Sequence, residues 1–126
     1  MTEDKLAEML KLQKEFQIKT GFEPPLHDLA SALMTEGGEV WAAAGGKWWK
    51  HYINEMAWGE FQAKGNVDDY LKKLESQNHE HLVEESIDVF HFLLCMWIRL
   101  GIDANEVFES YCSKMKVNLK RQDDKY

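Results

Sequence analysis

Two pairs of acidic residues with helical spacing are the strongest chemical feature of the sequence. Glu36 and Glu39 are three positions apart, and so are Glu85 and Asp88. Because positions i and i+3 share one face of a helix, each pair would present its carboxylates side by side. Two such pairs that faced each other would supply the oxygen ligands that hard divalent cations prefer. The spacing therefore predicts a divalent-metal site that could polarise phosphates and activate water.

A single ExxE pair is more often a solvated helix surface, because Glu is a common helix residue. Two features favour a site here. Gly37 and Gly38 lie between the first two glutamates, and a glycine costs a helix about 1 kcal/mol relative to alanine, which favours a close approach of some group to this backbone. Asp88 leads into VFHFLLCMWI, residues 89–98. A helix apolar on every side should be buried, and a buried carboxylate needs a partner or a metal.

His91 follows Asp88 by one helical turn. From the residues alone, a hydrogen-bonded core histidine is the more common interpretation of such a position. The Asp88-x-x-His91 spacing also suggests a carboxylate-bridged iron protein, but ferritin-like sites use Glu-x-x-His pairs, and the sequence contains none. A helical dimerisation module without enzymatic activity is the remaining alternative, and it would bind no metal.

Helical periodicity runs through most of the chain, and proline and glycine divide it into segments. No stretch alternates as a strand would. Pro24-Pro25, Gly45-Gly46 and Gly101 mark ends, and Asp103 with Glu106 forms a capping-box pattern at the last helix. We predict an all-α fold, a bundle of four to six helices in one domain over residues 1–126. The expected helices cover approximately residues 3–19, 26–44, 68–74, 79–100 and 104–122, with an irregular segment at 47–66 that holds at most one short helix.

Composition limits the classes of function. The 126-residue chain is 44% hydrophobic and 29% charged, with a net charge of -7. An acidic chain is a poor binder of nucleic acid, because phosphate attraction supplies most of that affinity. The longest apolar run, residues 89–100, is interrupted by His91 and Arg99 and is too short to span a membrane. Two isolated cysteines and a charged N-terminus without a signal peptide predict a cytoplasmic protein.

The helix over residues 79–100 has an apolar stripe formed by Val83, Ile87, Phe90 and Leu94. The chain also contains five Trp. A chain of this length has few other helices with which to cover a helix that is apolar all round. We therefore expect a homodimer.

Short motifs in a fixed order carry a family resemblance. The ExxE pair followed by the ExxD pair resembles the all-α, MazG-like nucleotide pyrophosphohydrolases. Four further stretches are similar to the dimeric dUTPases within that superfamily: LQ at 12–13, KWWK at 47–50, EESIDVFHF at 84–92, and YCSKMKVNLKRQDDKY at 111–126. The resemblance implies a homodimer that hydrolyses dUTP, and dUDP as well, between the α- and β-phosphates. The product is dUMP, with diphosphate released from dUTP.

The same resemblance implies roles for individual residues. The four carboxylates would bind two or three Mg²⁺ ions, for which Mn²⁺ could substitute. Glu39, with Glu36 as second candidate, would orient and deprotonate the attacking water. Lys50, Lys114 and Arg121 would neutralise the phosphates, and Asn118 would bind phosphate or sugar. The base site would be lined by Gln13, Trp49, His91 and Phe92.

The chain departs from the dUTPase pattern in three places. About 45 residues separate Glu39 from Glu85, more than that family's linker. An insertion lies between Trp49 and Leu82, and Lys125 stands where a glycine is expected. These departures concern mainly the specificity for the base, so another nucleotide such as dCTP is the alternative substrate.

Overall fold

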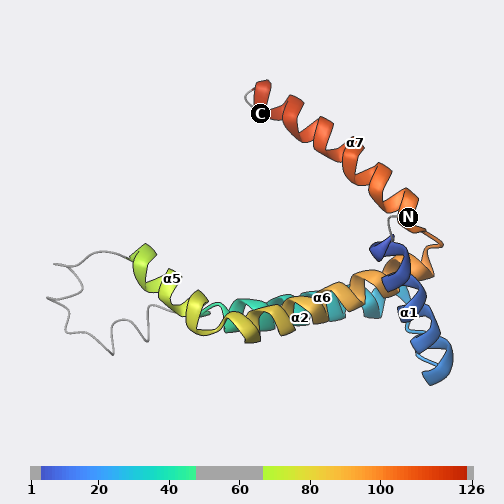
Figure 1. Cartoon of the computed structure of the whole chain (residues 1–126), viewed down its shortest axis with the longest axis horizontal. Helices are drawn as coiled ribbons and strands as arrows, with labels where there is room; N and C mark the ends of the chain where they lie inside the picture. Colours follow the sequence, from blue (N-terminus) through green and yellow to red (C-terminus); the bar gives the residue numbers. More distant parts are fainter. Residues whose placement is uncertain (1–3, 48–66, 125–126) are drawn as a thin grey trace, which may run out of the picture. The chain divides into compact units, whose positions relative to one another are not determined.

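The computed structural model describes residues 4–47 and 67–124, which form five α-helices and contain no strand (Figure 1). The all-α prediction is confirmed, and each expected helix is found within about three residues of its expected ends. The prediction for residues 48–66 lies outside the described residues. The helices are α1 (Lys5–Thr20), α2 (Leu26–Ala43), α5 (Val67–Gln77), α6 (His79–Arg99) and α7 (Ala104–Asp123).

Local sequence sets the helix ends. The Asp103 side chain accepts a hydrogen bond from the Glu106 backbone N–H at 2.9 Å, which confirms the predicted cap of α7. Gly46 has φ 45° and donates its N–H to the Trp41 carbonyl at 2.8 Å, closing the end of α2. Gly101 has φ 70° at the end of α6. Glycine adopts such positive φ values without steric cost, which explains why these helices stop where they do.

The chain divides into two compact units: residues 1–29 with 93–126, and residues 30–92. In the first unit α1 contacts α7. Its buried apolar side chains are Leu10, Leu29, Leu94 and Cys95. The prediction of one domain over the whole chain stays a prediction.

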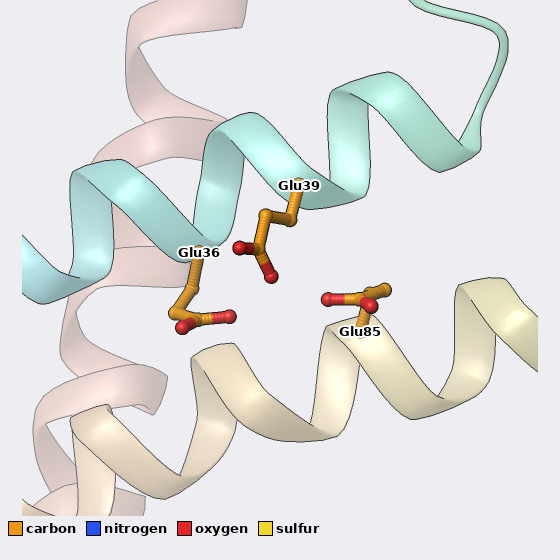
Figure 2. Close-up of side chains that lie close together, drawn as sticks. All are labelled: Glu36, Glu39 and Glu85. Carbon is orange, nitrogen blue, oxygen red and sulfur yellow. The ribbon is translucent and has the colours of Figure 1, made fainter.

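The second unit contains most of α2, all of α5 and the part of α6 up to Phe92. Its segments of α2 and α6 lie side by side (Figure 2). The expected burial of α6 from residue 89 on is found in part: Leu94 and Cys95 are buried, His91 is exposed, and the other residues of 89–98 are half-buried. Earlier on the helix, Val83 is 47% and Ile87 45% exposed.

No helix among the described residues combines the length and apolar character required to cross a bilayer.

Candidate functional site

Three carboxylates from two helices converge in the second unit. Glu36 and Glu39 come from α2, and Glu85 comes from α6. Each offers an oxygen, and these oxygens all lie within 4.8 Å of one another. Figure 2 shows the three side chains pointing into the space between the two helices. The i, i+3 spacing on α2 turns both of its glutamates towards α6, which is why two short sequence motifs become one cluster.

Asp88 is the fourth predicted carboxylate, and it lies beside this cluster. It is half-buried on α6, one turn beyond Glu85. Its charge contributes to raising the pKa of both Glu36 and Glu85. The structure therefore brings three of the four predicted ligands within ligand distance of one another and places the fourth close enough to act on their charge.

The cluster is electrostatically strained without a counter-charge. Burial raises the pKa of Glu36, and the charge of Glu39 and a hydrogen bond with Glu39 raise it further. A hydrogen bond with Glu39 raises the pKa of Glu85, followed by burial and the charge of Glu39, while the charge of His81 lowers it. Like charges held together favour the protonated form of each acid, which is the physical cause of both shifts.

Two oxygens of the cluster have no partner among the described residues. Oε2 of Glu36 and Oε2 of Glu85 are buried and accept no hydrogen bond from this part of the chain. A buried polar atom normally has a partner, and carboxylate oxygens in this position are suited to bind a cation. An all-oxygen donor set with excess negative charge fits a hard divalent cation such as Mg²⁺.

The raised pKa values predict how pH affects the metal-free protein. Glu36 and Glu85 keep their protons to higher pH in the folded state than in the unfolded chain, where the usual value is 4.5. The folded state thus binds more protons above that pH, so the free energy of unfolding falls as pH rises from about 4.5 through the raised folded values. Metal-free Glu36→Gln should therefore have a higher Tm than wild type at pH 7.5, with a smaller difference at pH 4.5. Thermal unfolding in EDTA measures both.

Glu84→Gln is the matched control for this experiment, because Glu84 is an exposed carboxylate on α6 outside the cluster. It should shift the Tm little at either pH. A Glu36→Gln protein less stable than wild type at pH 7.5 would contradict the repulsion.

A cavity of about 540 Å³ opens directly beside the cluster. Its residues on α5 and at the start of α6 belong to none of the sequence motifs described above. The one local pattern pointing to them is the i, i+4 pair of His81 and Glu85, whose Nδ1 and Oε1 lie 3.9 Å apart. The lining residues are Glu39, Ala42, Ala43, Gly45, Tyr70, Leu74, Asn78, His81 and Glu85.

Two of the predicted base-site residues belong to the same unit as the carboxylates. His91 is exposed one turn beyond Asp88, so the interpretation of it as a core residue is wrong for the described chain. His91 is exposed because no described helix covers the side of α6 on which it lies. Phe92 is half-buried.

The remaining predicted substrate residues belong to the first unit or lie outside the described residues. Gln13 is half-buried on α1 and donates its amide Nε2–H to the Cys95 sulfur at 3.1 Å. The α7 residues Lys114, Asn118 and Arg121 are exposed. Their spacing of four and three places them on one face of the helix. Trp49 and Lys50 lie outside the described residues.

The paired glycines of α2 have open space around them. A Cβ added at Gly37 or Gly38 would meet no described atom within 4 Å outside its own helix. The expected close approach to this backbone is therefore not supplied by the residues that the structure describes.

Comparison with known proteins places this helical carboxylate site in a family. Residues 4–114 match the phosphoribosyl-ATP pyrophosphohydrolase family. The chain belongs to this family. The narrower resemblance to the dimeric dUTPases is not shown by these matches. No solved structure matches the chain significantly.

This phosphoribosyl-ATP pyrophosphohydrolase family member is also similar to curated phage proteins. It is 33% identical over 85 residues to a dCTP pyrophosphatase of Enterobacteria phage T4, covering 59% of this chain and 50% of the relative. It is 35% identical over 89 residues to a dCTP pyrophosphatase of Enterobacteria phage LZ5, covering 71% and 46%. A DNA replication protein of phage T4 is 31% identical over 86 residues, covering 58% and 22%. The chain spans about half the length of the two dCTP pyrophosphatases.

Proposed function

We propose that this protein is a divalent-metal-dependent nucleotide pyrophosphohydrolase that converts dCTP and water to dCMP and diphosphate. The observation that carries the proposal is the convergence of Glu36, Glu39 and Glu85, two of whose buried oxygens accept no hydrogen bond from a described residue. Family membership supports the reaction class. Two relatives bear the name dCTP pyrophosphatase, which favours cytosine over the uracil of the first expectation.

The second candidate substrate is dUTP, with dUDP. It rests on the motifs at 84–92 and 111–126, which resemble those of dimeric dUTPases. Both candidates share one reaction, in which water adds to the α-phosphorus and the bond to the α–β bridging oxygen breaks. The two candidate substrates differ only in the base, and the reaction at the phosphates does not distinguish one base from another.

The chemistry assigned to the site combines cations with one proton acceptor. Bound Mg²⁺, with Mn²⁺ as a substitute, would polarise the phosphoryl oxygens and lower the pKa of a bound water. Glu36, Glu39, Glu85 and Asp88 would hold these ions. Glu39 faces the cavity and is the most accessible of the converging carboxylates. In this proposal it orients the water and takes its proton.

Phosphate binding is assigned to the basic residues named by the resemblance. Lys114 and Arg121, with Asn118 between them, occupy one face of α7. An Arg guanidinium can hold a phosphate through two parallel hydrogen bonds, whereas a Lys contributes a point charge. Lys50 and Trp49 would complete the site, and the resemblance assigns the base to Gln13, His91 and Phe92.

A panel of nucleotides tests the substrate. Diphosphate release from dCTP, dUTP, dTTP, dATP, dGTP and phosphoribosyl-ATP would be measured with Mg²⁺ present. The proposal expects the highest kcat/KM for dCTP. A higher value for dUTP would select the second candidate. Turnover of none of these nucleotides would favour the non-enzymatic dimerisation module.

We also expect the protein to form a homodimer. The described residues expose many large apolar side chains, among them Met34 at 81% and Phe108 at 63%. Burial of such side chains against a second copy of the chain would remove their apolar surface from water. Sedimentation equilibrium at tens of micromolar should give twice the chain mass of 14.7 kDa. A species of one chain mass at that concentration would contradict the dimer.

A further inference from the structure

The cavity beside the carboxylates has the size and character of a small-molecule site. Its volume of about 540 Å³ falls within the range of about 300–1,000 Å³ found for ligand pockets. Glu39 and Glu85 belong to both the cavity and the carboxylate cluster. A nucleotide whose phosphates are held at the cluster therefore has the cavity directly next to it.

The cavity wall away from the cluster suits a base better than a phosphate. Ala42, Ala43 and Leu74 contribute apolar surface, and Tyr70 contributes an aromatic ring. Flat bases stack on such rings, which favours binding without selecting among bases. Among the lining residues only His81 can carry a positive charge, so the wall offers little to a polyphosphate.

Asn78 lines the cavity, and a hydrogen bond orients its side-chain amide. It is the single residue between α5 and α6. Its side-chain Nδ2 donates to the Leu74 carbonyl at 2.8 Å, and its own carbonyl accepts from the Leu82 N–H at 2.8 Å. A backbone carbonyl can only accept, so the Asn78 amide cannot flip without losing this bond. Oδ1 is left as a hydrogen-bond acceptor, and no donor from the described residues reaches it.

We propose that this cavity holds the base of the nucleotide and that Asn78 Oδ1 accepts a hydrogen bond from the exocyclic amino group of cytosine. Cytosine presents an amino donor at the position where uracil presents a carbonyl oxygen. With uracil, two acceptors would face each other and a partly buried amide oxygen would stay unpaired. A site built to hydrogen-bond one group discriminates strongly against a ligand that lacks it. The inference rests on the proposed function and deepens it.

This placement competes with the one implied by the family resemblance. In the chain, the cavity residues Asn78 and His81 precede the carboxylates Glu85 and Asp88, whereas His91 follows them. The nucleotide would therefore extend in opposite directions from the cluster in the two placements. Substitutions at the two ends separate them.

The test measures kcat/KM for dCTP and dUTP in Asn78→Leu, with Gln77→Leu as the matched control. Gln77 is the preceding amide residue, is exposed and does not line the cavity. Loss of one buried hydrogen bond should reduce the dCTP/dUTP ratio at least about tenfold in Asn78→Leu, and Gln77→Leu should keep the wild-type ratio. An unchanged ratio in Asn78→Leu, or a ratio lost in His91→Ala instead, would overturn the inference.

A second variant tests the cavity without removing the hydrogen bond from the Asn78 side chain to the Leu74 carbonyl on α5. Leu74→Trp fills the cavity from α5 and leaves the Asn78 side chain in place, and Lys73→Trp adds the same ring at an exposed neighbouring position. Calorimetric titration with dCMP and Mg²⁺ should show at least about tenfold weaker binding in Leu74→Trp only. Equal dCMP binding in both variants would overturn the cavity assignment.

The two proposals fail differently. The inference fails and the enzymatic function stands if the wild type turns over dCTP, Asn78→Leu keeps the wild-type dCTP/dUTP ratio of kcat/KM, and Leu74→Trp keeps the wild-type affinity for dCMP. If the wild type neither hydrolyses any nucleotide of the panel nor binds dCMP, both fail.

Discussion

Glu39→Gln is expected to lower kcat for dCTP by about 10²- to 10⁴-fold, the range that a positioned general base contributes. A neutral amide can neither take the proton of the attacking water nor match a carboxylate as a ligand for a hard cation. Gln has nearly the shape of Glu, and Glu39 is exposed, so the fold should be kept. Steady-state kinetics with saturating Mg²⁺ measure the loss, and circular dichroism checks the helices.

A second variant tests the same site, and a third serves as the control. Asp88→Asn should also lower kcat strongly, because Asp88 is the fourth predicted ligand and its charge acts on the cluster. Glu84→Gln removes an exposed carboxylate from the same helix outside the cluster and should behave as wild type. Near wild-type turnover in Glu39→Gln would exclude it as the base, and near wild-type turnover in both Glu39→Gln and Asp88→Asn would exclude the carboxylate site.

Removal of divalent metal should abolish turnover completely, and this is the second large effect. The converging carboxylates carry no described positive partner other than His81, so the phosphates of a substrate would be repelled without cations. Excess EDTA should stop diphosphate release, and Mg²⁺ or Mn²⁺ added beyond the chelator should restore it. Full activity in excess EDTA would end the metal-dependent proposal.

Metal binding should also be visible without substrate. A ligand that binds only the folded state at 100 times its Kd adds about 2.7 kcal/mol to the free energy of unfolding. Mg²⁺ should therefore raise the Tm of wild type and of Glu84→Gln, and raise that of Glu85→Gln much less. Sodium chloride at matched ionic strength controls for general screening. Equal Mg²⁺ shifts in all three proteins would place the ion elsewhere.

Local sequence determined the helices and the metal-binding motifs. Prolines, glycines and the Asp103 cap act within a few residues of themselves, so the expected helix ends agree with the structure. The i, i+3 spacing of each carboxylate pair is likewise a property of one helix. The order of the motifs was also sufficient to identify the pyrophosphohydrolase superfamily, which the family match over residues 4–114 supports.

Local sequence could not determine in the same way which base the substrate carries. Discrimination between cytosine and uracil depends on whether a donor or an acceptor atom faces the ligand. At Asn78 that choice is made by a hydrogen bond to Leu74, and a sequence does not state how an amide is turned. The dUTP expectation came from a family resemblance that assigns the base to Gln13, Trp49, His91 and Phe92, and residue types alone do not state which atoms face the base.

Only the tertiary structure decided which side chains meet. Glu85, rather than Asp88, joins Glu36 and Glu39 within 4.8 Å, because the relative rotation of α2 and α6 selects one carboxylate of the second pair. The exposure of Val83 and His91 depends on which sides of α6 other helices cover. The cavity arises where α5, distant in sequence from α2, places Tyr70 and Leu74 beside its last turn. Helical periodicity fixes directions within one helix, whereas packing between helices fixes the rotation and distance that bring functional atoms together.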